Sequence, residues 1–192
     1  MSRPANPEFQ FEGINHLALV CKDMARTVDF YTGVLGMPLI KTIDLPGGMG
    51  QHFFFDVGNG DCIAFFWFAN APEAQPGIAS ATQAMIPGVS AHGSMNHVAI
   101  NVAADKIDEY YDKLLAKGIQ ASKVISHDDS PMQASLEITP TTFVRSIYFY
   151  DPDGICLEFA AWTRDLPREG DVRHKPISVS SVAKAQVAVP AE

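Results

Sequence analysis

The stretch that decides the fold is Ser146-Ile147-Tyr148-Phe149-Tyr150-Asp151-Pro152-Asp153-Gly154-Ile155-Cys156-Leu157-Glu158-Phe159-Ala160-Ala161-Trp162. It predicts two strands joined by a tight turn, because the proline of Asp151-Pro152-Asp153-Gly154 fixes one φ and the glycine is free to adopt a positive φ. Glu158 stands out, since the strand around it is otherwise apolar or Cys. A buried carboxylate is costly unless it is paired or bound to a cation. A glutamate facing water at a sheet edge is the alternative interpretation.

The composition is that of an ordinary globular protein. The chain has 192 residues, and 47% of them are hydrophobic, which is enough for one good core or two small adjoining ones. A net charge of −8 argues against nucleic acid or an anionic membrane surface as a partner. No apolar run approaches the roughly 18 residues of a membrane span.

The cysteines and the N-terminal residues indicate in which cellular compartment the protein is expected. The 3 cysteines lie far apart and show no CxxC spacing, which is typical of a reduced protein. The first residues of the chain lack the apolar segment of a signal peptide. We therefore expect a cytoplasmic location.

An internal repeat organises the chain, because the order strand, helix and three strands is predicted twice. Ile14–Leu19 matches Met95–Ile100 in character at nearly every position, and each stretch contains an Asn-His pair. His16 and His97 are therefore equivalent residues on equivalent predicted strands.

A second match follows in the same order, between Phe55–Phe65 and Tyr150–Phe159. It makes Ala64 the counterpart of Glu158, since each lies four residues after a turn glycine. Two matches in the same order favour duplication, and pseudo-symmetry would bring equivalent strands together around one concavity. Two histidines and one carboxylate would then face that concavity, with one position left without a ligand.

The predicted fold class is α+β, with two βαβββ modules that together form one domain. The first module is expected at residues 12–70 and the second at 94–163, joined by a linker at 71–93 that is rich in Ala, Pro, Gly and Ser. Residues 1–11 are expected to form an N-terminal arm. Residues 164–192 are expected to form a C-terminal tail that is partly disordered or lies on the surface.

Over about residues 12–163 the chain resembles the vicinal oxygen chelate superfamily, which includes glyoxalase I, extradiol dioxygenases, fosfomycin-resistance and bleomycin-resistance proteins. The most specific piece is Ile147-Tyr148-(x2)-Asp151-Pro152-Asp153-Gly154-(x3)-Glu158, which is similar to the C-terminal half of the extradiol dioxygenase signature. The resemblance implies that the modules curl into an incomplete barrel around a central metal cavity. It places His16, His97 and Glu158 at the metal-ligand positions.

Two imidazoles and one carboxylate suit non-haem Fe(II), with positions open for a bidentate substrate and O₂, and Mn(II) also suits this donor set. The resemblance therefore implies a metal-dependent, extradiol-dioxygenase-like enzyme that binds a catecholic small molecule. Tyr148 is the candidate catalytic residue, because it could hydrogen-bond a substrate oxygen; a cross-strand aromatic in the core is the alternative. A homodimer is compatible with the sequence.

Strand alternation predicts that Cys156, Glu158 and Ala160 share one face, and that Cys62 and Ala64 likewise face the cavity. For Cys156 a small apolar filler is the favoured interpretation. An apolar pocket wall is one interpretation of four further aromatic residues, with core packing an equally good explanation: Phe53, Phe55, Phe65 and Trp67.

The remaining histidines have no repeat partner. His127 and His92 could edge the cavity, but loop positions in water are the favoured interpretation for both and for His52 and His174. Arg145 could orient an anionic substrate, although a surface arginine is the default.

Two departures from the family patterns matter. The extradiol signature begins with a histidine several residues before the Ile-Tyr pair, where this chain has Thr139-Pro140-Thr141-Thr142, so the acid/base residue is unassigned. Glyoxalase I relatives carry a glutamate where this chain has Ala64. Two alternatives stay open: a glyoxalase-like lyase, isomerase or thiol transferase using a divalent metal, and a metal-free resistance protein that binds a small molecule.

Overall fold

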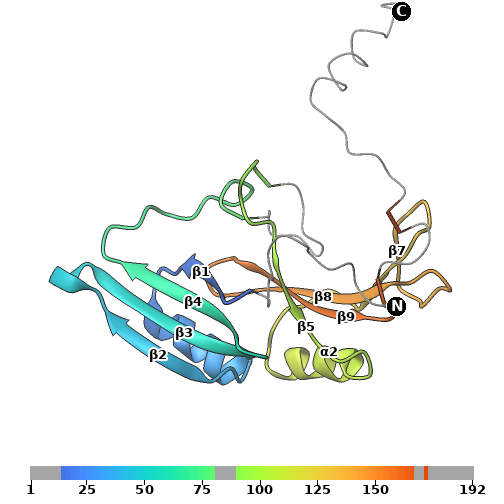
Figure 1. Ribbon diagram of the computed structural model, residues 1–192, viewed down its shortest axis with the longest axis horizontal. Helices are drawn as coiled ribbons and strands as arrows, with labels where there is room; N and C mark the ends of the chain where they lie inside the picture. Colours follow the sequence, from blue (N-terminus) through green and yellow to red (C-terminus); the bar gives the residue numbers. More distant parts are fainter. Residues whose placement is uncertain (1–13, 81–89, 167–170, 173–192) are drawn as a thin grey trace, which may run out of the picture. The chain divides into compact units, whose positions relative to one another are not determined.

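The structure is a computed structural model that describes residues 14–80, 90–166 and 171–172 (Figure 1). The chain divides into two compact units, and Asn6–Arg164 contains every described helix and strand. The other unit consists of Met1–Ala5 and Asp165–Glu192. None of the helices in the described part is long and apolar enough to cross a membrane.

Several sequence predictions lie outside the described residues. These are the N-terminal arm at residues 1–11, residues 81–89 of the linker, and most of the C-terminal tail, including His174.

The first sheet has four strands in the order β1-β4-β3-β2. The strands are β1 (His16–Val20), β2 (Leu39–Asp44), β3 (Gly50–Gly58) and β4 (Asp61–Phe68). Strand β1 runs parallel to β4, and the other pairs are antiparallel. Between β1 and β2, helix α1 (Met24–Val28) continues directly into a π-helix, η1 (Asp29–Val34), and a 3₁₀ turn, η2 (Pro46–Gly48), precedes β3.

The second sheet repeats this order with one added edge strand, β5-β9-β8-β6-β7. Its elements are β5 (Val98–Asn101), α2 (Ile107–Ala116), β6 (Ile125–His127), β7 (Ala134–Ser135), β8 (Val144–Tyr150) and β9 (Cys156–Trp162). Strand β5 is parallel to β9, as β1 is to β4. The α+β fold with two sheets is confirmed, and neither sheet closes into a barrel among the described residues.

The hydrophobic core lies on one face of each sheet. Phe55 and Phe65 of the first sheet and Phe149 and Leu157 of the second are fully buried in it, together with Tyr31 of η1. Burying each of these side chains contributes roughly 1.5–3 kcal/mol.

The predicted pocket wall belongs to this core. Phe55 and Phe65 are fully buried, and Phe53 and Trp67 pack against the same cluster. Core packing is therefore the correct interpretation of Phe55 and Phe65, and Phe53 and Trp67 pack at the edge of the same core, where Trp67 also lines a hollow. The side chains of these four residues, all at odd-numbered positions of β3 and β4, point to the face opposite Ala64, because successive side chains in a strand alternate.

The Asp151–Gly154 turn between β8 and β9 contacts the first half of the chain. Asp153 Oδ2 accepts a hydrogen bond from the Lys22 amide at 2.9 Å, and Tyr31 donates its hydroxyl proton to Asp151 Oδ2 at 3.3 Å. Within the turn, Asp151 Oδ1 accepts from the amides of Asp153 and Ile155 at 2.9 and 2.8 Å. Gly154 has a φ of 84°, the conformation that its position in the turn predicted.

Candidate functional site

The residue that stood out in the sequence, Glu158, is buried in the middle of β9 and faces a histidine. Its Oε2 lies 2.9 Å from Nε2 of His97, the residue just before β5. The carboxylate is 7% exposed and the imidazole 33%. Burial alone would raise the pKa of Glu158, but the His97 and Ser146 side chains next to the carboxylate hold it below its ordinary value. The interpretation of Glu158 as a water-facing edge residue is wrong.

The other nitrogen of the His97 ring is held by the preceding asparagine. His97 Nδ1 donates to Asn96 Oδ1 at 2.8 Å, so a neutral imidazole has its lone pair on Nε2, toward Glu158. Two acceptors that face each other at 2.9 Å repel unless a cation, either a proton or a metal ion, lies between them. A histidine oriented through Nδ1 with Nε2 free is the arrangement that metal ligands use.

His16 makes the same local contact in the first sheet. Its Nδ1 donates to Asn15 Oδ1 at 2.8 Å, so the Asn-His pair is repeated in geometry as well as in sequence. His16 is exposed, at the start of β1. Within one chain, the described residues contain no group of three or more His, Cys, Asp and Glu side chains placed to hold a metal ion. The structure therefore brings His97 and Glu158 together, and His16 does not join them in the same chain.

Tyr148 of β8 is the direct strand neighbour of Glu158. Its ring lies edge-on to His97, with ring centroids 5.7 Å apart. Burial, and then the Glu158 carboxylate, raise the pKa of Tyr148 to about 12, so its phenol keeps its proton at neutral pH.

His127, which the sequence favoured as a loop histidine, is instead the last residue of β6, and its Nε2 lies 3.1 Å from the Tyr148 hydroxyl. Its sequence neighbours are polar, so no local pattern indicated this contact.

A row of aromatic rings runs along the face of the first sheet that carries His16. Centroid distances are 5.6 Å from His16 to Phe54, 4.3 Å from Phe54 to His52, 3.6 Å from His52 to Phe66, and 5.2 Å from Phe66 to Phe68. We call these five residues the aromatic row. His52 is buried within β3, so its interpretation as a loop histidine in water is wrong. Because strands alternate, they share this face with Ala64 and Cys62.

Other candidates lie away from these groups or have structural contacts. Arg145 donates two hydrogen bonds to Asp108 of α2, at 2.9 and 2.8 Å, and its side chain is 14% exposed, so it is a structural arginine and not the surface arginine of the default interpretation. Cys156 is fully buried beside Tyr148 and Ile125, as a small apolar filler would be, and burial raises its pKa to about 11. His92 is exposed.

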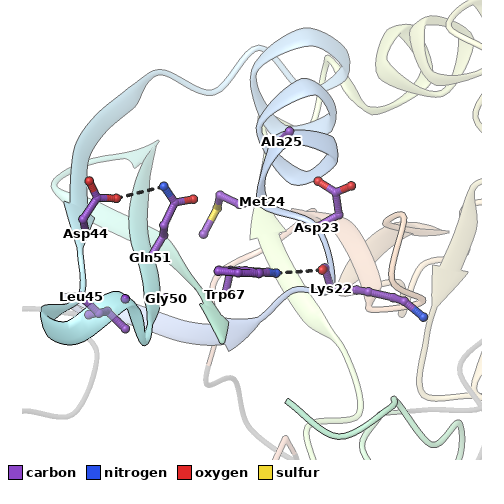
Figure 2. Close-up of a pocket in the computed structure, with 10 residues that line it drawn as sticks. Lys22, Asp23, Met24, Ala25, Asp44, Leu45, Gly50, Gln51 and Trp67 are labelled. Carbon is purple, nitrogen blue, oxygen red and sulfur yellow. Dashed lines mark hydrogen bonds between the residues drawn. The ribbon is translucent and has the colours of Figure 1, made fainter. Parts of the chain in front are cut away.

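A hollow of about 690 Å³ lies between the segment that leads into α1, the β2–β3 turn and Trp67 of β4 (Figure 2). Several of its polar side chains already have partners: Trp67 Nε1 donates to the Lys22 carbonyl at 3.1 Å, and Gln51 donates to Asp44 at 3.0 Å. None of the candidate metal ligands lines it, nor does Tyr148; of the aromatic residues considered as a pocket wall, Trp67 does.

Known proteins resemble this chain in sequence and in fold. It is 28% identical over 152 residues to the metallothiol transferase FosB of Lysinibacillus sphaericus, covering 79% of this chain and 84% of that protein. It is 25% identical over 167 residues to 4-hydroxyphenylpyruvate dioxygenase of Daucus carota, covering 81% of this chain but only 37% of that protein.

Among solved structures, a mutant of the fosfomycin resistance protein FosX from Listeria monocytogenes, in complex with Mn(II) and a dihydroxypropylphosphonic acid, matches with a TM-score of 0.50 and 20% identity. The match covers 82% of this chain and 96% of that one.

The family model of the Glyoxalase/Bleomycin resistance protein/Dioxygenase superfamily matches residues 13–159, most of the chain and both sheets. The repeated strand order, the duplicated Asn-His pairs and the single carboxylate on β9 lie within that match. The chain belongs to the Glyoxalase/Bleomycin resistance protein/Dioxygenase superfamily.

Proposed function

We propose that this protein is a metal-dependent enzyme of the extradiol-dioxygenase type, with His16, His97 and Glu158 as metal ligands and a catecholic substrate. The observation that carries the proposal is the 2.9 Å approach of His97 Nε2 to Glu158 Oε2, with Nδ1 of the same ring held by Asn96. This arrangement favours a cation between the two side chains. Fe(II) is the favoured metal and Mn(II) the second choice, because both accept mixed nitrogen and oxygen ligands.

The third ligand comes from a second copy of the chain in this proposal. His16 is exposed and oriented by Asn15 in the same way as His97, but it lies on the other sheet. On the face of the first sheet that carries His16, Ala18 and Val20 are also exposed, and Phe68 is 38% exposed. A homodimer in which this face covers the His97–Glu158 face of the partner would bury these apolar groups and complete both sites by symmetry.

The aromatic row supports a planar aromatic substrate. It would form the wall opposite Glu158 in such a dimer, where a ring can stack on Phe66 or Phe54. A phosphonate, such as the one in the FosX complex, would need cationic partners. Arg145, the arginine nearest to Glu158 in the sheet register, is instead bonded to Asp108.

The bound metal would supply Lewis-acid and redox chemistry toward the substrate and O₂. The chain's own side chains have separate tasks. Asn96 and Asn15 orient the two imidazoles, and burial keeps Glu158 fixed. Tyr148 retains its proton and can donate a hydrogen bond to a substrate oxygen.

A second candidate function is thiol transfer or isomerisation on a divalent metal, which the 28% identity to FosB favours. A glyoxalase with four protein ligands is disfavoured by Ala64. A metal-free binding function would not explain why asparagines orient both histidines, or why His97 lies so close to Glu158. The three cysteines are free thiols, which supports the predicted cytoplasmic location.

The deciding experiment is metal analysis of protein purified without added metal, followed by reconstitution with Fe(II) or Mn(II). Oxygen uptake on a panel of catechols is expected with Fe(II), and Glu158→Gln is the matched inactive control. Turnover with Mn(II) and a thiol, without oxygen uptake, would favour the second candidate. Absence of any bound metal after reconstitution would exclude both.

A further inference from the structure

The candidate site contains a histidine that the family pattern does not assign. His127 pairs with Val144 of β8, and Ile125 of the same short strand pairs with Ser146. Directly paired side chains in an antiparallel sheet point to the same face. His127 therefore shares the face of Ser146 and Tyr148, and through Tyr148 that of Glu158.

The position of the His127 ring is well defined by its surroundings. Its Nε2 lies 3.1 Å from the Tyr148 hydroxyl, and the two rings are nearly perpendicular, at 79°. The His127 carbonyl accepts from the Phe143 amide at 2.9 Å. The next residue, Asp128, is buried, and its carboxylate accepts from the Ser130 amide and the Thr139 hydroxyl, each at 3.0 Å. These bonds fix the backbone that presents the imidazole.

Tyr148 has one proton, and the groups beside it that can accept this proton include His127 Nε2, 3.1 Å from the hydroxyl, and the carboxylate of Glu158, its direct partner in the β8–β9 ladder. A carboxylate is the stronger acceptor, because a hydrogen bond to a charged group is roughly twice as strong as one between neutral groups. The phenol proton is therefore directed to the Glu158 side. The phenol oxygen is then left as an acceptor for His127.

We propose that His127 is a positioning residue that donates from Nε2 to the phenol oxygen of Tyr148, so that the Tyr148 proton points toward Glu158 and a substrate oxygen. The substrate part of this inference rests on the proposed function, and the hydrogen bond does not. His127 thus orients the Tyr148 hydroxyl, the group that would contact substrate, and it does so from β6, which lies outside the signature motif.

The direction of the hydrogen bond can be measured without turnover. Nitrogen-15 NMR of the full-length protein treated with a chelator reports which imidazole nitrogens carry a proton, and loss of one signal set in His127→Gln assigns His127. A protonated Nε2 that shifts in Tyr148→Phe is expected, while the His92 signals stay unchanged. An unprotonated Nε2, or a His127 signal indifferent to Tyr148→Phe, overturns the proposal even if the enzyme proves to be a dioxygenase.

Kinetics on the catechol selected by the panel separate positioning from simple structural support. Glutamine can donate from its side-chain amide at a similar reach, whereas leucine cannot donate. His127→Gln is expected to keep kcat within about twofold, and His127→Leu to lower kcat about tenfold at a nearly unchanged KM, the loss that corresponds to one hydrogen bond.

Comparing the effect of His127→Leu in the wild-type protein and in Tyr148→Phe tests whether His127 acts through Tyr148. In Tyr148→Phe the further change His127→Leu should have no additional effect, because residues that act as a unit are not additive. An equal loss in both backgrounds would show that His127 does not act through Tyr148. Ser126→Ala is the matched control, since Ser126 is buried on the same strand but faces the other side. If no catechol is turned over, the proposed function fails while the NMR result still decides this inference.

Discussion

Ala64 and Glu158 occupy the same position in the two sheets. Ala64 pairs with Ala18 across the parallel β1–β4 ladder, and Glu158 pairs with Ala99 across the parallel β5–β9 ladder. Each alanine partner lies two residues after the histidine of an Asn-His pair. The duplicated frame therefore presents two histidines but only one carboxylate, and neither face alone carries all three of the proposed metal ligands.

A shared site predicts complementation between two inactive variants. His16→Ala and Glu158→Ala should each abolish turnover as pure dimers. Mixed dimers contain one site with both defects and one intact site, so unfolding and refolding an equal mixture should restore about a quarter of wild-type activity. Activity assays with the oligomeric state measured in parallel test this; a mixture as inactive as its components would refute a site shared between chains.

Asn96 is expected to control metal affinity through the His97 ring. Asn96→Ala removes the acceptor that holds Nδ1, and loss of such a partner typically weakens metal binding about 10- to 100-fold. Asn96→Asp keeps an acceptor and should bind at least as well as wild type. Calorimetric titration with Mn(II) measures both. Asn101→Ala, at the exposed end of β5, is the control and should leave the affinity unchanged.

Asp151 is expected to make stability depend on pH. Burial raises the pKa of Asp151 to about 6, against an ordinary value of 3.8. Because the folded state holds the proton more tightly, the stabilisation from protonation is fully present below about pH 4 and is lost as the pH rises through 6. Asn keeps an acceptor for the Asp153 and Ile155 amides without the buried charge.

Asp151→Asn should therefore be stabilised relative to wild type at pH 8, and this gain should shrink by up to about 3 kcal/mol at pH 4. Urea unfolding of both proteins across this range measures the difference. A difference in unfolding free energy that stays constant with pH would contradict the assignment.

Neighbouring phenylalanines on β4 should separate stability from substrate binding. Phe65 is fully buried in the core, so Phe65→Ala should cost about 3–5 kcal/mol of unfolding free energy. Phe66 is half-buried in the aromatic row, so Phe66→Ala should cost less and should instead raise KM for a catechol several-fold. Denaturant unfolding and steady-state kinetics give the two readouts. An unchanged KM in Phe66→Ala would remove the aromatic row from the substrate pocket.

The order of elements and the repeat could be predicted from the sequence, because they rest on local signals. Apolar periodicity, the turn at Asp151–Gly154 and the two Asn-His pairs each act over a few residues and are visible in the chain itself. Glu158 was conspicuous for the same reason, as the one carboxylate in an apolar strand. Element ends were less well defined, because His97 precedes β5 instead of lying inside the strand as expected.

The sequence by itself determined the duplicated βαβββ frame, the residue types of the candidate site and their asymmetry between Ala64 and Glu158. Tertiary structure alone decided which aromatics face the core and which form the aromatic row, because a one-residue change of face reverses the assignment of Phe65 and Phe66. It also placed His127 against Tyr148 and kept His16 apart from Glu158 in one chain. These relationships depend on strand pairing between distant segments, and no local pattern encodes that pairing.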